Sequence, residues 1–75
     1  MLLQELNEGQ EGAIDHFLNE ELAVKLMAMG VLPGSRVRVV RRAGAGNTLY
    51  IKVDQLHLAI RKKEAACIVL KPSIP

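Results

Sequence analysis

The segment Leu22–Met29 is apolar on nearly every face of the helix that its spacing predicts. Leu22, Leu26 and Met29 stand at i, i+4 and i+7, so they share a face that can cover a core. Lys25 is the only charge within the segment, and the other faces also carry apolar residues: Ala23, Val24, Met27 and Ala28. A helix that is apolar all round is normally buried on several sides. Since a chain of 75 residues is too small to surround it, we expect part of this helix to contact another molecule.

Clear start and stop signals bound this helix. Asn19 is a favourable N-cap, and the two glutamates that follow it suit the positive end of the helix dipole. Gly30 stands where a helix commonly ends in a residue with positive φ. Pro33 presets φ at the second position of a turn, and Gly34 supplies positive φ at the third, which is the preference of a type II turn. The sequence therefore predicts a helix that leads through a tight turn into a strand.

Alternation of apolar and polar residues predicts five short strands around this helix. In the strand that starts at Arg36, Val37 and Val39 point inward, and the alternation breaks at Val40, which indicates a bulge or the end of the strand. Gly46 lies in the following hairpin connection. The other strands are expected at residues 13–18, 49–53, 56–61 and 67–71, with turns at residues 9–12, 54–55 and 62–66.

These elements predict a mainly β fold with one helix between the first two strands. Five short strands suggest a small closed or partly open barrel, because closure removes the sticky edges of an open sheet. We expect the lone helix to cap or flank it. Residues 1–71 are read as a single domain and residues 72–75, which begin with a proline, as a C-terminal tail.

Composition supports a small aliphatic core in a reducing compartment. Hydrophobic residues make up 49% of the chain, and Phe17 and Tyr50 are its only aromatic residues. A chain of this length buries only about 60% of the surface that it exposes when unfolded. Cys67 is the only cysteine, which excludes an internal disulfide. Without a signal peptide or a stretch of ~20 apolar residues, the expected location is the cytoplasm, with no direct membrane insertion.

Charge is distributed unevenly along the chain. Residues 1–24 hold six acidic residues and no basic one, whereas residues 25–75 hold ten basic and two acidic residues. Folding brings distant segments together, so this pattern favours a mixed surface with local ion pairs. The alternative is a basic face that binds nucleic acid, built from Arg36, Arg38, Arg41, Arg42, Arg61, Lys62 and Lys63. The near absence of aromatic residues that could stack on bases argues against it, so no nucleic acid is expected.

Candidate chemistry is sparse. The glycine-rich segment at residues 44–48 lacks the lysine and the spacing of a P-loop. Asp15 and His16 are neighbours on a predicted strand, so we expect them to point to opposite faces and not to share a metal ion. Ser35 and Ser73 have no base placed near them in the sequence. We therefore expect no catalytic residue, no metal site and no cofactor, and predict that this chain is not an enzyme.

The order of these elements resembles the FeoA family, the small cytoplasmic companions of the bacterial ferrous iron transporter FeoB. The residues that carry the resemblance are Gly9, Gly12, Ile14, Leu26, Met29-Gly30-Val31, Pro33-Gly34, Gly46, Ile51-Lys52-Val53 and Leu58-Ala59-Ile60-Arg61. The module is also similar to the C-terminal domain of metal-dependent repressors of the diphtheria toxin repressor type. The resemblance spans residues 3–70 and implies an SH3-like five-stranded barrel, no catalytic activity and a role in ferrous iron uptake. Thr48 stands where the family often has Pro, and Gln55 stands where it usually has Gly.

The resulting hypothesis is a non-enzymatic adaptor that contacts the cytoplasmic GTPase region of FeoB and so lies at the inner face of the membrane. The expected contact residues are Met27, Val31, Leu32, Arg36 and Arg38, and the expected structural turn residues are Gly30, Pro33, Gly34 and Gly46. The alternatives are a small basic barrel that binds nucleic acid and a stand-alone relative of the repressor's accessory domain. The same helix surface could instead join copies of the chain in a weak homo-oligomer.

Overall fold

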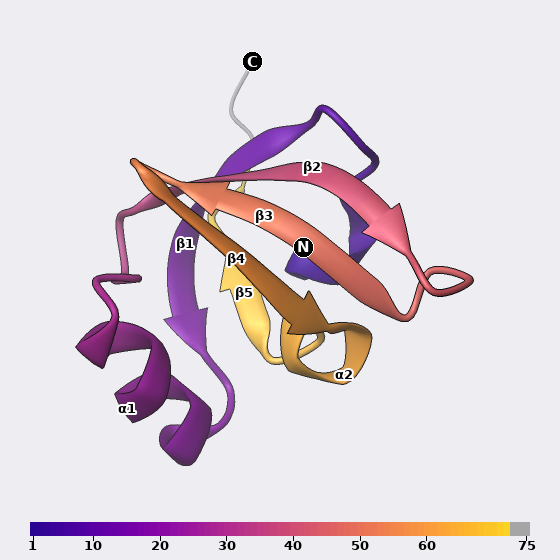
Figure 1. Cartoon of the computed structure of the whole chain (residues 1–75). Coiled ribbons are helices and arrows are strands. Elements are labelled where there is room, and N and C mark those ends of the chain that lie inside the picture. The colour runs from indigo at the N-terminus through magenta and orange to yellow at the C-terminus, as the bar shows by residue number, and fades with distance from the viewer. Residues whose placement is uncertain (73–75) are drawn as a thin grey trace.

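The computed structural model describes residues 1–72, in which five antiparallel strands form one curled sheet (Figure 1). The strand order is β4-β3-β2-β1-β5. The strands are β1 (Glu11–Phe17), β2 (Arg36–Ala43), β3 (Thr48–Val53), β4 (Leu56–Arg61) and β5 (Ile68–Leu70). The helix α1 (Glu20–Ala28) lies between β1 and β2, the short helix α2 (Lys62–Ala65) joins β4 to β5, and the 3-10 turn η1 (Leu3–Glu5) precedes β1. The predicted mainly β fold, with one helix between the first two strands, is confirmed.

Two irregularities bend the sheet towards a barrel. The first half of β1 pairs with β2 and its second half with β5, with a register shift between Ile14 and His16. A second shift lies between Val39 and Arg41 of β2, so the bulge predicted at Val40 is confirmed. Bulges bend a strand and increase its twist. As a result β1 and β5 lie behind the layer formed by β2, β3 and β4 (Figure 1).

The core between these layers is aliphatic, as the composition predicts. It contains the inward residues of the alternating strands together with residues from η1, α1 and α2. Its fully buried large side chains are Leu3, Ile14, Leu26, Leu49, Ile51, Ile68, Val31, Val37, Val39 and Val53. Within residues 1–72 no polar or charged residue is buried. The fold is therefore stabilised mainly by apolar burial and by the strand ladders.

Several predicted boundaries differ from the structure. β1 begins at Glu11, two residues earlier than expected, because the turn lies at Asn7–Gln10. The predicted polar turn at residues 62–66 is the helix α2, in which Glu64 accepts a hydrogen bond from the Arg61 N–H at 2.8 Å. No element was predicted before residue 9, yet η1 lies there and places Leu3 in the core. Of the predicted tail, Ser73–Pro75 lie outside the described residues.

Gly30 and Gly34 take the positive φ predicted for them, and Gly46 lies in the predicted hairpin connection. Gly30 and Gly34 have φ of 93° and 91°, and Gly46 in the β2–β3 hairpin has φ of 87°. Ser35 N–H donates to the Leu32 carbonyl at 2.9 Å, which closes the turn that contains Pro33 and Gly34. In the described part of the chain, no helix is both long and apolar enough to cross a lipid bilayer.

Candidate functional site

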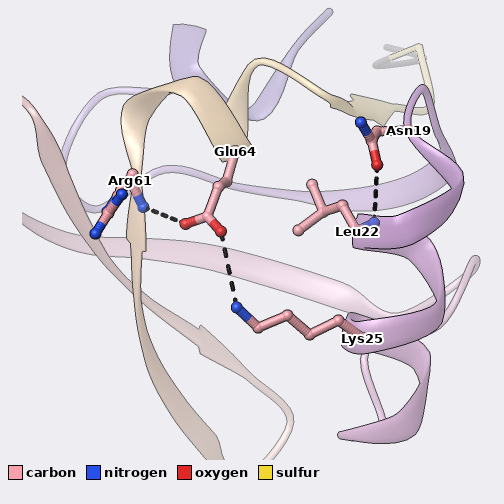
Figure 2. Close-up of polar contacts among 5 residues, drawn as sticks. All are labelled: Asn19, Leu22, Lys25, Arg61 and Glu64. Atoms are coloured by element: carbon pink, nitrogen blue, oxygen red, sulfur yellow. Dashed lines mark hydrogen bonds and ion pairs between the residues drawn. The ribbon is translucent and has the colours of Figure 1, made fainter.

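The start of α1 is fixed by a side-chain cap. The Asn19 side chain accepts a hydrogen bond from the Leu22 N–H at 2.9 Å, as Figure 2 shows. Glu20 and Glu21 occupy the first turn, where negative charge is favourable next to the helix dipole. The N-cap predicted at Asn19 is thus confirmed, and α1 begins directly after the loop that follows β1.

The end of α1 is a Schellman motif, which explains why one predicted contact residue is buried. Gly30 N–H donates to the Met27 carbonyl at 3.0 Å, and Val31 N–H donates to the Leu26 carbonyl at 2.9 Å. This pair of bonds brings the second residue beyond the helix cap onto its last turn, usually with an apolar contact. Leu26 and Val31 both lie in the core. The expectation that Val31 contacts a partner is therefore wrong, since its side chain is 0% exposed.

Most apolar side chains of α1 and of the following turn face outward. Leu26 is the only fully buried residue of α1, and Leu22 is half-buried. Val24 is 68% exposed, Met27 and Met29 are each 41% exposed, and Leu32 is 46% exposed. Met29 was expected on the core face, but it is the C-cap, where the chain leaves the helix. We call these four side chains the α1 surface: Val24, Met27, Met29 and Leu32.

α1 stands at one side of the barrel (Figure 1). Lys25 Nζ lies 4.0 Å from Glu64 Oε2 on α2, across a groove between the two helices, as Figure 2 shows. The Lys25 side chain is 67% exposed, so this ion pair contributes little to stability. Leu26, the half-buried Leu22 and the Schellman motif therefore attach α1 to the barrel, while its large apolar side chains Val24 and Met27 face solvent.

The four arginines of β2 make different contacts. Arg36 forms an ion pair with Glu11 at 3.0 Å, and Arg38 lies exposed on the same face of β2. The Arg41 guanidinium lies 4.7 Å from the centroid of the Tyr50 ring. Arg42 turns to the N-terminal segment, where its guanidinium donates to the carbonyls of Gln4 and, at 2.6 Å, Leu6.

These contacts leave no continuous set of free cations on β2. One arginine is paired with a carboxylate, one stacks on a tyrosine and one binds backbone carbonyls, so the mixed surface with local pairing is confirmed for this strand. The arginines that follow the α1 surface in sequence are Arg36 and Arg38. Val31 is buried in the core, so the five predicted contact residues are not all available to a partner.

Few other described side chains are of a type that could take part in catalysis or metal binding. The β1 bulge brings the side chains of Asp15 and His16 together, with 2.5 Å between Oδ2 and Nδ1. The expectation that they point apart is thus wrong, because a register shift interrupts the alternation of a strand. Within residues 1–72 no three His, Cys, Asp or Glu side chains gather as a metal site would require. Ser35 Oγ accepts from the Leu32 N–H at 3.1 Å, which is a turn contact.

Comparisons with known proteins agree with this architecture. The model of the FeoA domain matches residues 1–72. The solution structure of the FeoA protein from Chlorobium tepidum has a TM-score of 0.87 at 25% identity, covering 93% of this chain and 68% of that one. The FeoA of Stenotrophomonas maltophilia, solved with zinc and described as a prokaryotic SH3 domain protein, has a TM-score of 0.82 at 26% identity, covering 95% of this chain and 89% of that one.

A manganese-dependent transcriptional repressor shares the fold. It has a TM-score of 0.82 at 17% identity, covering 93% of this chain and 40% of that one. At this identity the likeness concerns the fold alone. The predicted similarity to a domain of metal-dependent repressors is thereby confirmed at the level of architecture, and the SH3-like description of the barrel is confirmed by the zinc-bound relative.

Proposed function

Because this chain belongs to the FeoA domain family, which is associated with ferrous iron transport, we propose that it is a non-enzymatic accessory protein that binds the cytoplasmic GTPase region of a FeoB-type transporter. On this proposal it acts at the inner face of the membrane through its partner, without a cofactor or a metal of its own. The observation that carries the proposal is the α1 surface, where four apolar side chains within nine residues face solvent.

The partial exposure of these side chains suits a weak, regulatory contact. Complete burial of an exposed aliphatic side chain is worth about 1.5–3 kcal/mol. Each side chain of the α1 surface already has part of its area buried, so the gain per residue is a fraction of that value. Association also costs several kcal/mol in lost translational and rotational freedom. We therefore expect a complex that forms and dissociates readily.

The test is a calorimetric titration of the transporter's soluble GTPase domain into this protein. Met27→Asp and Met27→Lys place a charge within the α1 surface, and the lysine also suits the negative end of the helix dipole. Both variants are expected to weaken binding at least about tenfold, because a charge would be desolvated in the contact. Val40→Asp is the matched control, since Val40 is a similarly exposed apolar residue on β2.

The outcomes are distinct. Loss of binding in both Met27 variants, with Val40→Asp like the wild type, supports the proposal. Unchanged binding in the Met27 variants removes α1 from the contact. The nucleic-acid alternative is tested in parallel with mixed-sequence DNA and RNA at low salt, where phosphate contacts would be strongest. We expect no retention, because three of the four β2 arginines, Arg36, Arg41 and Arg42, are engaged within the chain.

A further inference from the structure

The outer edge of β4 carries backbone groups that the described chain leaves without a partner. Lys62 N–H donates to the Asn47 carbonyl at 2.8 Å, on the side of β3. Backbone groups of successive strand residues point to opposite sides, so Ile60, Leu58 and Leu56 also bond towards β3. The N–H and C=O groups of His57 and Ala59 therefore point away from the sheet, at the end of its strand order.

The opposite edge of the sheet is covered. Leu2 forms an isolated bridge with Val69 of β5, and the Leu70 N–H donates to the Met1 carbonyl at 2.7 Å. On the β4 side, Glu64 accepts the Arg61 N–H, which ends the edge at that residue. Within residues 1–72, the β4 edge is thus left open between Gln55 and Arg61, whereas the β5 edge is closed by the N-terminus.

The side chains of β4 do not prevent a further strand from pairing with this edge. An open edge is a template for a further strand, and natural proteins usually blunt it with proline, lysine or a bulge. β4 contains none of these and pairs with β3 in unbroken register. Leu56 and Leu58 point inward and are only half-buried, because the layer ends beside them. A strand added here would cover both leucines and satisfy the groups of His57 and Ala59.

We propose that this edge pairs with β4 of a second copy of the chain, antiparallel about a two-fold axis at Leu58. In that register His57 of one copy exchanges both backbone hydrogen bonds with Ala59 of the other. The turn before β4, which carries Asp54, then lies next to the start of α2 of the other copy, which carries Lys62. By symmetry this opposite-charge contact forms at both ends of the paired strands.

Charge favours this arrangement, because the turn before β4 carries the acidic Asp54 and the start of α2 carries the basic Lys62 and Lys63. The pairing therefore joins two curled sheets edge to edge, through β4 and not through the α1 surface. It does not depend on the proposed function.

Sedimentation equilibrium from low to high protein concentration tests the pairing. We expect the mean mass to rise from monomer towards dimer, and the Ala59 and His57 amides to exchange hydrogen more slowly as the concentration rises. Ala59→Pro removes an N–H that the monomer does not use, so it should weaken association at least about tenfold while retaining the monomer's circular dichroism spectrum. Ala59→Thr, which keeps the N–H, is the matched control.

A second variant keeps the test decisive if Ala59→Pro fails to fold. Lys62→Glu should weaken association by placing two acids together, whereas Lys63→Glu, with the same net charge, should weaken it less. A mass that stays monomeric at every concentration would overturn the proposal. So would a dimer that Met27→Asp abolishes and Lys62→Glu leaves intact. Protection of the His57 and Ala59 amides only after a transporter domain is added would assign the edge to a different partner and also overturn it.

Discussion

At the scale of single residues, Arg42 has a role that its position in the sequence hides. The alternation of β2 makes it one of several arginines on a strand, and the sequence offers no reason to separate it from Arg41. The bulge at Val40 shifts the register, so Arg42 turns towards the N-terminal segment. There its guanidinium binds two backbone carbonyls, and its own N–H donates to the Glu8 carboxylate at 2.9 Å.

Arg42→Ala should therefore destabilise the protein more than Arg41→Ala. The Arg42 variant loses charge-assisted hydrogen bonds that hold the segment carrying Leu3 against β2, and we expect a loss of about 1–3 kcal/mol. Arg41 contributes one exposed contact with the Tyr50 ring, worth about 0.5–1 kcal/mol. Urea denaturation of the two variants measures the difference, and equal losses would contradict the role assigned to Arg42.

At the scale of elements, regular patterns were predictable, whereas most local irregularities were not, with the bulge at Val40 as the exception. Alternation located β2, β3 and β4, and the cap and glycine signals located α1, because each depends on residues close in sequence. The pairing of Asp15 with His16 depends on a bulge that only the pairing with β5 reveals. The helix α2 has four residues, too few for a helical period to be visible.

The candidate site follows the same division. The surplus of apolar residues around Lys25 was visible in the sequence, and the exposure of Val24 and Met27 agrees with it. The burial of Val31 follows from the Schellman motif. Gly30 is a signal for that motif in the sequence, and the motif places the next residue against the last turn of the helix. Exposure of Met29 could not be read from spacing, because the helix ends one residue before it.

Alanine substitutions within α1 should distinguish its buried residue from its exposed face. Leu26→Ala removes the one fully buried side chain of the helix and should cost about 2–5 kcal/mol in the free energy of unfolding. Val24→Ala, on the exposed face, should change it by less than about 0.5 kcal/mol. Thermal or urea unfolding measures both. A large loss from Val24→Ala would contradict the description of α1 as a helix attached through one face.

At the scale of the whole molecule, a chain of 75 residues presents two surfaces that its own fold leaves incomplete. One is the α1 surface, which is apolar and faces solvent. The other is the β4 edge, whose backbone groups face solvent. We assign the first to the transporter and the second to another copy of the chain, so the two contacts predict separate sets of sensitive residues.

Amide chemical-shift mapping tests the proposed contact between the α1 surface and the transporter residue by residue. The measurement follows the labelled protein while the unlabelled GTPase domain of the transporter is added. If the α1 surface is the contact, the largest shifts will gather at Val24, Met27, Met29 and Leu32 and weaken towards β3. Shifts confined to Val40, Tyr50 and the rest of the β2–β3 face, with α1 unchanged, would contradict it.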